Sequence, residues 1–200
     1  GDLTTCLGWK NGDELQTTLA DLMNNTLIEK PLRKSEGILH HEEGVDLIPS
    51  NLELSAMEMG LVNAMSRELT LKNCLKEFRK DYEYILIDCM PSLGMITVNA
   101  LTAADSVIVP VQAQYLPAKG MTQLVQTIGK VKRTINPNLE IDGIVLTLVD
   151  SRTNLAKQTL RILRNQYGNR MKIYSSQIPV AVKAAETSFK GRSIYSYDKN

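Results

Sequence analysis

The sequence is poor in aromatic residues and in long apolar runs. Phe, Trp and Tyr make up 5% of its 200 residues, and no apolar run approaches the ~20 residues that a membrane-spanning helix needs. No pattern typical of a signal peptide opens the chain. Aliphatic residues dominate instead, as expected for a sheet covered by helices, and the length suits a single α/β domain over residues 1–200.

Cysteine and histidine are scarce. Cys6, Cys74 and Cys89 have neither the spacing of a disulfide framework nor that of a metal site, so we expect buried structural thiols in a reduced, cytoplasmic protein. The two histidines, His40 and His41, are adjacent and have no partner at metal-ligand spacing. No metal site is therefore predicted from them.

A phosphate-binding glycine loop is also missing. The pattern Gly-x-x-x-x-Gly-Lys-Ser/Thr, which cradles phosphates with backbone N–H groups and a lysine, occurs nowhere in the 200 residues. We therefore expect this chain, taken alone, to hold a nucleotide poorly and to be inactive as an ATPase.

Charge is unevenly distributed along the chain. Residues 1–118 carry 9 Lys and Arg against 17 Asp and Glu, whereas residues 119–200 carry 14 against 5. A basic C-terminal half is typical of a protein that binds a polyanion. Lysine-rich helices facing solvent would give the same counts, so charge alone leaves both interpretations open.

The segment from Tyr84 to Gly94 combines an apolar run with a carboxylate. Residues 85–87 predict a strand buried on both faces, and Asp88 follows at its carboxyl end. Pro91 and Gly94 then indicate a loop. Ligands of open α/β sheets bind at this end of the strands, although Asp88 could also only cap the helix that follows.

The residues after Asp88 carry a family resemblance. Asp-Cys-Met-Pro-Ser-Leu-Gly at 88–94 and Asn-Ala-Leu-Thr-Ala-Ala-Asp at 99–105 closely resemble the ParA/Soj/MinD-like partition ATPases, which are deviant-Walker P-loop NTPases. Met90 replaces the first proline of the family pattern. The resemblance implies that Asp88 is the catalytic carboxylate that orients Mg²⁺ and that Pro91 belongs to the nucleotide-binding loop.

The hydrophobic pattern and the resemblance together predict a doubly wound, mostly parallel sheet with helices on both faces. Strands are expected at 45–48, 85–87, 106–111, 141–149 and 172–178, and helices at 15–23, 54–65, 69–78, 93–104, 119–135 and 153–167. In the last helix, Leu155, Ile162 and Leu163 are expected to face inward. The resemblance further implies that the family's first strand–loop–helix unit precedes Gly1 and that its final helix follows Asn200.

Two further segments match the family. Asp-Ser-Arg-Thr-Asn at 150–154 corresponds to its Asp-x-Arg-Thr-Asn, which implies a DNA-binding role for Arg152; an unpartnered surface arginine is the alternative. Ile178 and Pro179 correspond to the pair that abuts the adenine. Lys183 keeps a positive charge where the family has a DNA-contacting arginine, whereas Val180 replaces another.

The resemblance implies a chromosome, plasmid or mobile-element partition ATPase in the bacterial cytoplasm at the nucleoid. Such a protein uses ATP and Mg²⁺, forms a homodimer, binds DNA non-specifically, has no stable membrane association, and hydrolyses ATP when a ParB-like partner stimulates it. The missing glycine loop leaves a nucleotide-free DNA-binding or scaffold module as an alternative. A MinD-like membrane-cycling ATPase is the other.

Overall fold

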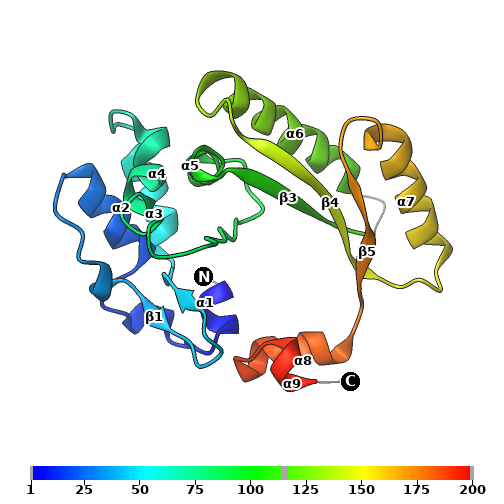
Figure 1. The fold of residues 1–200 in the computed structure, drawn as a ribbon, viewed down its shortest axis with the longest axis horizontal. Coiled ribbons are helices and arrows are strands. Elements are labelled where there is room, and N and C mark those ends of the chain that lie inside the picture. Colours follow the sequence, from blue (N-terminus) through cyan, green and yellow to red (C-terminus); the bar gives the residue numbers. More distant parts are fainter. Residues whose placement is uncertain (1, 114–116, 199–200) are drawn as a thin grey trace. The chain divides into compact units, whose positions relative to one another are not determined.

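The computed structural model describes residues 2–113 and 117–198, which form two units (Figure 1). We call residues 1–103 with 182–200 the helical unit and residues 104–181 the sheet unit. Within the described residues, no helix is both long and apolar enough to cross a membrane. Gln114 and Tyr115, part of the segment after the strand predicted at 106–111, lie outside the described residues.

The helical unit contains short helices and one two-stranded hairpin. In chain order these are α1 (Asp2–Cys6), η1 (Gly12–Glu14), α2 (Leu19–Leu27), η2 (Lys34–Glu36), β1 (Leu39–His40), β2 (Asp46–Leu47), α3 (Glu53–Leu61), η3 (Arg67–Leu69), α4 (Thr70–Leu75), α5 (Met95–Ala103), α8 (Val182–Lys190) and α9 (Ile194–Tyr197). Its core joins α2, α3, α4 and α5 through Leu22, Met23, Leu61, Leu71, Cys74, Leu75, Phe78 and Ala100.

Helix α2 begins later than the pattern predicted. Residues 15–23 were expected, but the helix spans Leu19–Leu27 because Thr18 starts it. Asp21 Oδ2 accepts hydrogen bonds from the backbone N–H of Thr18 (2.8 Å) and from its hydroxyl (2.9 Å). This arrangement satisfies N–H groups that a helix start otherwise leaves unpaired.

The C-terminal residues of the helical unit are tied to the hairpin. Glu43, in the turn between β1 and β2, accepts hydrogen bonds from Ser193 N–H (3.0 Å) and Ser196 Oγ (2.7 Å). These bonds lower the pKa of Glu43 to about 2. Gly191 has φ +67°, and a Cβ there would lie 2.6 Å from Gly8 Cα, so only glycine fits this crossing of two chain segments.

The sheet unit is a three-stranded parallel sheet. Its elements are β3 (Ser106–Gln112), α6 (Pro117–Thr134), β4 (Glu140–Val149), α7 (Asn154–Tyr167) and β5 (Ile173–Pro179), and the strand order is β3-β4-β5. The register pairs Val109 with Ile144, and Val149 with Pro179. The α/β class and the parallel sheet are therefore confirmed.

Helices α6 and α7 lie along the same side of this sheet (Figure 1). Met121 on α6 and Leu163 on α7 pack with Val109, Ile144 and Leu146 in one core. On the strands the intervening residues face away from these helices, and Ile108 (54% exposed) and Leu148 (50% exposed) remain open to solvent. The alternation follows from the two-residue side-chain period of a strand.

The predicted inner face of α7 was partly wrong. Leu163 is buried, but Leu155 is 45% exposed and Ile162 is 36% exposed; Ala156 and Thr159 are buried instead. Successive residues of an α-helix are 100° apart around its axis. The buried face of α7 is centred on Ala156, Thr159 and Leu163, so Leu155 and Ile162 lie at the side of this face.

The strand predicted at 85–87 does not form. Residues 84–90 belong to neither a helix nor a strand, no described strand pairs with them, and Leu86 is 91% exposed while Ile85 is 37% exposed. A strand requires a neighbouring backbone to satisfy its N–H and C=O groups. An apolar run indicates only that burial would be favourable, whereas actual burial requires a neighbouring strand or helix that covers the run.

Candidate functional site

Asp88 stands at the end of this apolar segment, in the helical unit. Its side chain is exposed and makes no hydrogen bond or ion pair with the other described residues. It does not cap α5, so the structural alternative for Asp88 receives no support. A free carboxylate without a competing cation is suited to Mg²⁺, which proteins often hold through one or two carboxylates together with water and substrate phosphates.

The described residues do not form a metal site by themselves. No group of three or more His, Cys, Asp or Glu side chains gathers among residues 2–113 and 117–198. His40 instead faces Asp46, with 2.6 Å between Nδ1 and Oδ1. His41 Nε2 lies 3.1 Å from the carbonyl oxygen of Gly191. Any Mg²⁺ at Asp88 would therefore depend on the oxygens of a nucleotide and of water.

The loop between Asp88 and α5 is folded by its own hydrogen bonds. Ser92 N–H donates to the carbonyl of Met90 (2.8 Å), and Gly94 N–H donates to Ser92 Oγ (3.4 Å). Thr97, in the first turn of α5, donates its hydroxyl hydrogen bond to the Ser92 carbonyl (2.7 Å). The loop that contains Pro91 is thus attached to the start of α5.

The three thiols do not share one environment. Cys74 is buried, Cys6 is half-buried, and Cys89, in the loop after Asp88, is exposed. The expectation that all three are buried was therefore correct for Cys74 and wrong for Cys89, because the segment that carries Cys89 has no neighbouring strand to cover it.

Helix α5 is fixed in turn by a buried asparagine. Asn99 is 0% exposed. Its Oδ1 accepts from Leu71 N–H (3.0 Å), and its Nδ2 donates to the carbonyls of Arg67 (2.9 Å) and Met95 (3.0 Å). This residue joins α5 to η3 and α4, so the helix that carries the Asp88 loop has one fixed position on the helical unit.

The sheet unit carries Arg152 just beyond β4. Its guanidinium is paired with Asp150: Nε lies 3.0 Å from Oδ1, and Nη2 lies 3.1 Å from Oδ2. This two-point hydrogen bonding lowers the pKa of Asp150 and raises that of Arg152. Thr153 then begins α7, because its Oγ1 accepts from Ala156 N–H (3.3 Å). The alternative of an unpartnered arginine was wrong, although the side chain is 88% exposed.

Ile178 and Pro179 lie at the carboxyl end of β5, beside the end of β4. Val180 N–H donates to the Val149 carbonyl (3.2 Å), which continues the pairing of Val149 with Pro179. Ile178 is 51% exposed. Arg152, just beyond β4, and the Ile178–Pro179 pair, at the end of β5, thus lie at the carboxyl ends of neighbouring strands, where open α/β sheets bind ligands.

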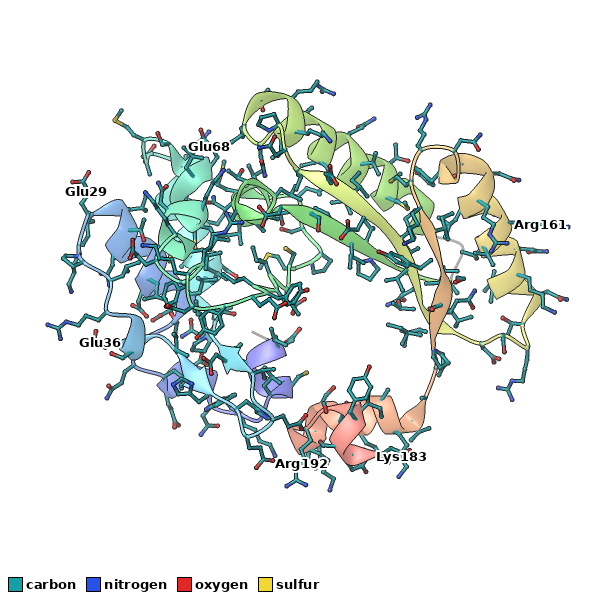
Figure 2. The ribbon with its side chains drawn as sticks, in the orientation of Figure 1. Glu29, Glu36, Glu68, Arg161, Lys183 and Arg192 are labelled. Carbon is teal, nitrogen blue, oxygen red and sulfur yellow. The ribbon has the colours of Figure 1, made fainter. Side chains whose placement is uncertain are left out.

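Lys183 lies on α8 of the helical unit (Figure 2). Its Nζ is 3.9 Å from Glu186 Oε2 and 5.2 Å from the centre of the Tyr197 ring. Tyr197 also donates a hydrogen bond to Glu186 (2.7 Å). Lys183 therefore has local partners, as Arg152 has in its own unit.

Helix α7 presents an additional row of cations. Lys157, Arg161 and Arg164 are exposed and make no ion pair with other described residues, and Arg161 extends away from the sheet in Figure 2. Their spacing places them on one flank of the helix. Regular spacing of this kind is visible in the sequence, whereas the contacts of the buried Asn99 around α5 had no signal in the sequence pattern.

Comparisons with known proteins decide the family. Residues 1–141 match the family described as AAA domain. The chain is 36% identical over 198 residues to the chromosome partitioning protein ParA of Myxococcus xanthus, covering 99% of this chain and 68% of that protein. The chain belongs to the ParA/Soj family of partition ATPases.

Other relatives agree with this assignment. The sporulation initiation inhibitor protein Soj of Bacillus subtilis is 42% identical over 156 residues, which are 78% of this chain and 61% of that protein. ParA of Caulobacter vibrioides is 41% identical over 157 residues, 58% of its length. The chain therefore spans about three fifths of the length of these two relatives.

Solved structures share the fold. Cobyrinic acid a,c-diamide synthase from Mycobacterium smegmatis with bound ADP and magnesium matches with a TM-score of 0.78 at 30% identity, over 95% of this chain and 76% of that chain. The ATP complex of a variant of Cyanothece McdA matches with a TM-score of 0.83 at 17% identity, over 98% and 75%. The second likeness concerns the fold alone.

Proposed function

We propose that the chain belongs to the ATPase domain of a ParA/Soj-type partition protein that hydrolyses ATP with Mg²⁺. The free carboxylate of Asp88 carries this proposal: it is exposed, unpaired among the described residues, and set at the start of a loop fixed to α5. Asp88 would hold Mg²⁺ with phosphate and water oxygens. The ion neutralises charge that develops on the transferring phosphoryl group.

Other side chains have roles in nucleotide binding. Pro91 shapes the loop after Asp88, and Ile178 and Pro179 offer an apolar edge for the adenine ring. The ADP and magnesium bound to the cobyrinic acid a,c-diamide synthase support a nucleotide and Mg²⁺ as cofactors. In this chain the phosphate-binding glycine loop has no counterpart, so nucleotide affinity is a property to be measured on the full-length protein.

DNA is the polyanion we propose for the basic half. Arg152 and Lys183 are the family-matched contacts. The exposed row Lys157, Arg161 and Arg164 on α7 adds positive charge that no described residue pairs with. A phosphate approaching Arg152 has to replace the Asp150 carboxylate, whereas one approaching α7 does not. Contacts of this kind are independent of base sequence.

A second copy of the chain is the partner we propose for α3. Leu52 (80% exposed), Met59 (75%) and Val62 (59%) expose apolar side chains along and beside this helix, and apolar surface of this kind marks interaction sites. ATP would drive this dimerisation, and a ParB-like protein would stimulate hydrolysis at the nucleoid in the bacterial cytoplasm.

The test uses the full-length protein with Mg²⁺ and ATP. Asp88→Asn should lower ATP hydrolysis by at least about tenfold, since it removes one charged ligand of the ion. DNA binding should require ATP and fall steeply with salt. Arg161→Ala should reduce the slope of log affinity against log salt by about 1, and Lys80→Ala, an exposed lysine in the acidic half, should leave it unchanged. DNA binding without nucleotide would favour the scaffold alternative.

A further inference from the structure

A carboxylate on a neighbouring helix reaches the start of α5. Glu58, in the middle of α3, has its Oε1 3.4 Å from the backbone N of Ile96, which donates to it. The first N–H groups of a helix have no partner within the helix, and a negative charge is stabilised at this end by the helix dipole. Glu58 therefore caps α5 from outside its own sequence neighbourhood.

The loop makes room for this carboxylate with a glycine. A Cβ at Gly94 would overlap Glu58 Oε1 and approach its Cδ to 2.8 Å. The φ of Gly94 lies outside the left-handed region, so alanine could adopt its backbone conformation. The glycine is therefore needed for space, and Gly94→Ala would push the flexible Glu58 side chain away without removing its charge.

Glu58 and Thr97 hold the two sides of the same junction. Thr97 attaches the Ser92 carbonyl to the first turn of α5, and Glu58 attaches the N–H of Ile96 in that turn to α3. Asp88 lies at the beginning of this loop and has no anchoring bond of its own among the described residues. The direction of its carboxylate therefore depends on how the loop is fixed at the other end.

We propose that Glu58 is a positioning residue for Asp88, acting through Gly94 and the start of α5. It does not touch nucleotide or metal; it sets the path of residues 89–94 so that the Asp88 carboxylate meets the ion. The inference rests on the proposed Mg²⁺-dependent ATPase function for its effect on catalysis. The effect of Glu58 on the conformation of the loop is independent of that function.

The experiment compares four variants in the full-length protein: Glu58→Ala, Glu58→Gln, Gly94→Ala and the control Glu53→Ala, which removes an exposed carboxylate from the same helix. The first readout is hydrogen exchange of the amides of residues 94–97 without nucleotide. Exchange should be about tenfold faster in Glu58→Ala and Gly94→Ala, as expected when a helix cap is lost. Glu58→Gln, which keeps an acceptor oxygen, should restore most of the protection.

The second readout is the Mg²⁺ concentration that gives half-maximal ATP hydrolysis. It should rise several-fold in Glu58→Ala and Gly94→Ala, stay near the wild-type value in Glu58→Gln, and be unchanged in Glu53→Ala. Faster exchange with an unchanged Mg²⁺ requirement would reduce Glu58 to a plain helix cap and overturn the inference. Unchanged exchange would overturn it as well.

The two readouts separate this inference from the function on which it rests. If the wild-type protein hydrolyses no ATP, the proposed function fails. The exchange data then still decide whether Glu58 fixes the loop. If ATP is hydrolysed but Glu58→Ala needs no more Mg²⁺ than the wild type, only the positioning role fails.

Discussion

Removing the buried amide of Asn99 should weaken the helical unit strongly. In Asn99→Ala, Leu71 N–H loses its acceptor in a buried position. The Arg67 carbonyl keeps the hydroxyl of Thr70 (3.0 Å), and the Met95 carbonyl keeps its helical bond. One donor is therefore left unsatisfied, which costs about 1–3 kcal/mol, and the lost side-chain volume adds about 1 kcal/mol.

We therefore expect the free energy of unfolding of the helical unit to fall by about 2–4 kcal/mol. The chain has one tryptophan, Trp9, in this unit, so urea unfolding followed by tryptophan fluorescence reports on it separately from the sheet unit. Asn63→Ala, which changes an exposed asparagine after α3, is the matched control and should change the free energy by less than about 0.5 kcal/mol.

A loss below about 0.5 kcal/mol for Asn99→Ala would contradict this expectation. It would mean that Leu71 N–H finds another acceptor or that α5 is not fixed by this residue. Asn99→Asp gives an internal check at low pH: the protonated side chain keeps the acceptor for Leu71 and one donor, so its loss should be smaller than that of the alanine variant.

Three further predictions concern the C-terminal residues and the sheet edge. Gly191→Ala should lower the midpoint of thermal unfolding more than Gly44→Ala does, because both have positive φ (+67° and +79°) but only Gly191 has a backbone atom, Gly8 Cα, where the methyl would go; equal shifts would refute the close crossing. The Glu43 carboxylate has a pKa of about 2 in the folded protein against 4.5 ordinarily, so its contribution to stability is complete above about pH 4.5 and disappears as pH falls towards 2. Acid titration should therefore destabilise the wild type more than Glu43→Gln between these values, and parallel curves would contradict the assigned hydrogen bonds. Asp150→Asn should free Arg152 from its carboxylate and strengthen DNA binding of the ATP-bound full-length protein at low salt, by about two- to fivefold; weaker binding in a filter or anisotropy assay would mean that the pair itself forms the contact surface.

Local sequence patterns were sufficient for the order of strands and helices in the sheet unit. The strand predicted at 141–149 is β4 (Glu140–Val149), and the helix predicted at 119–135 is α6 (Pro117–Thr134), where Met121, Ile128 and Val131 are buried at helical spacing. These elements alternate along the chain and pack on their sequence neighbours. Their hydrophobic period therefore carries most of the information about their burial.

The same patterns were insufficient for the helical unit and the candidate site. Asp88 and Pro91 could be placed on a loop by motif and by turn-forming residues, but the exposure of Leu86 could not be foreseen. The partner of Glu58 lies 38 residues away along the chain. The partners of Asn99 lie between 4 and 32 residues away. Contacts between such positions leave no periodic signal in the sequence.

The family, the order of helices and strands in the sheet unit, the Asp88 loop and the basic character of the C-terminal half could all be inferred from the sequence. Each of these depends on residue type and short-range spacing. Three contacts became visible in the folded chain alone: Arg152 is paired with Asp150, Glu43 accepts a hydrogen bond from Ser193, 150 residues away, and Glu58 caps helix α5, which follows the Asp88 loop. A hydrogen bond requires a particular distance and direction between donor and acceptor, and the fold of the whole unit sets both.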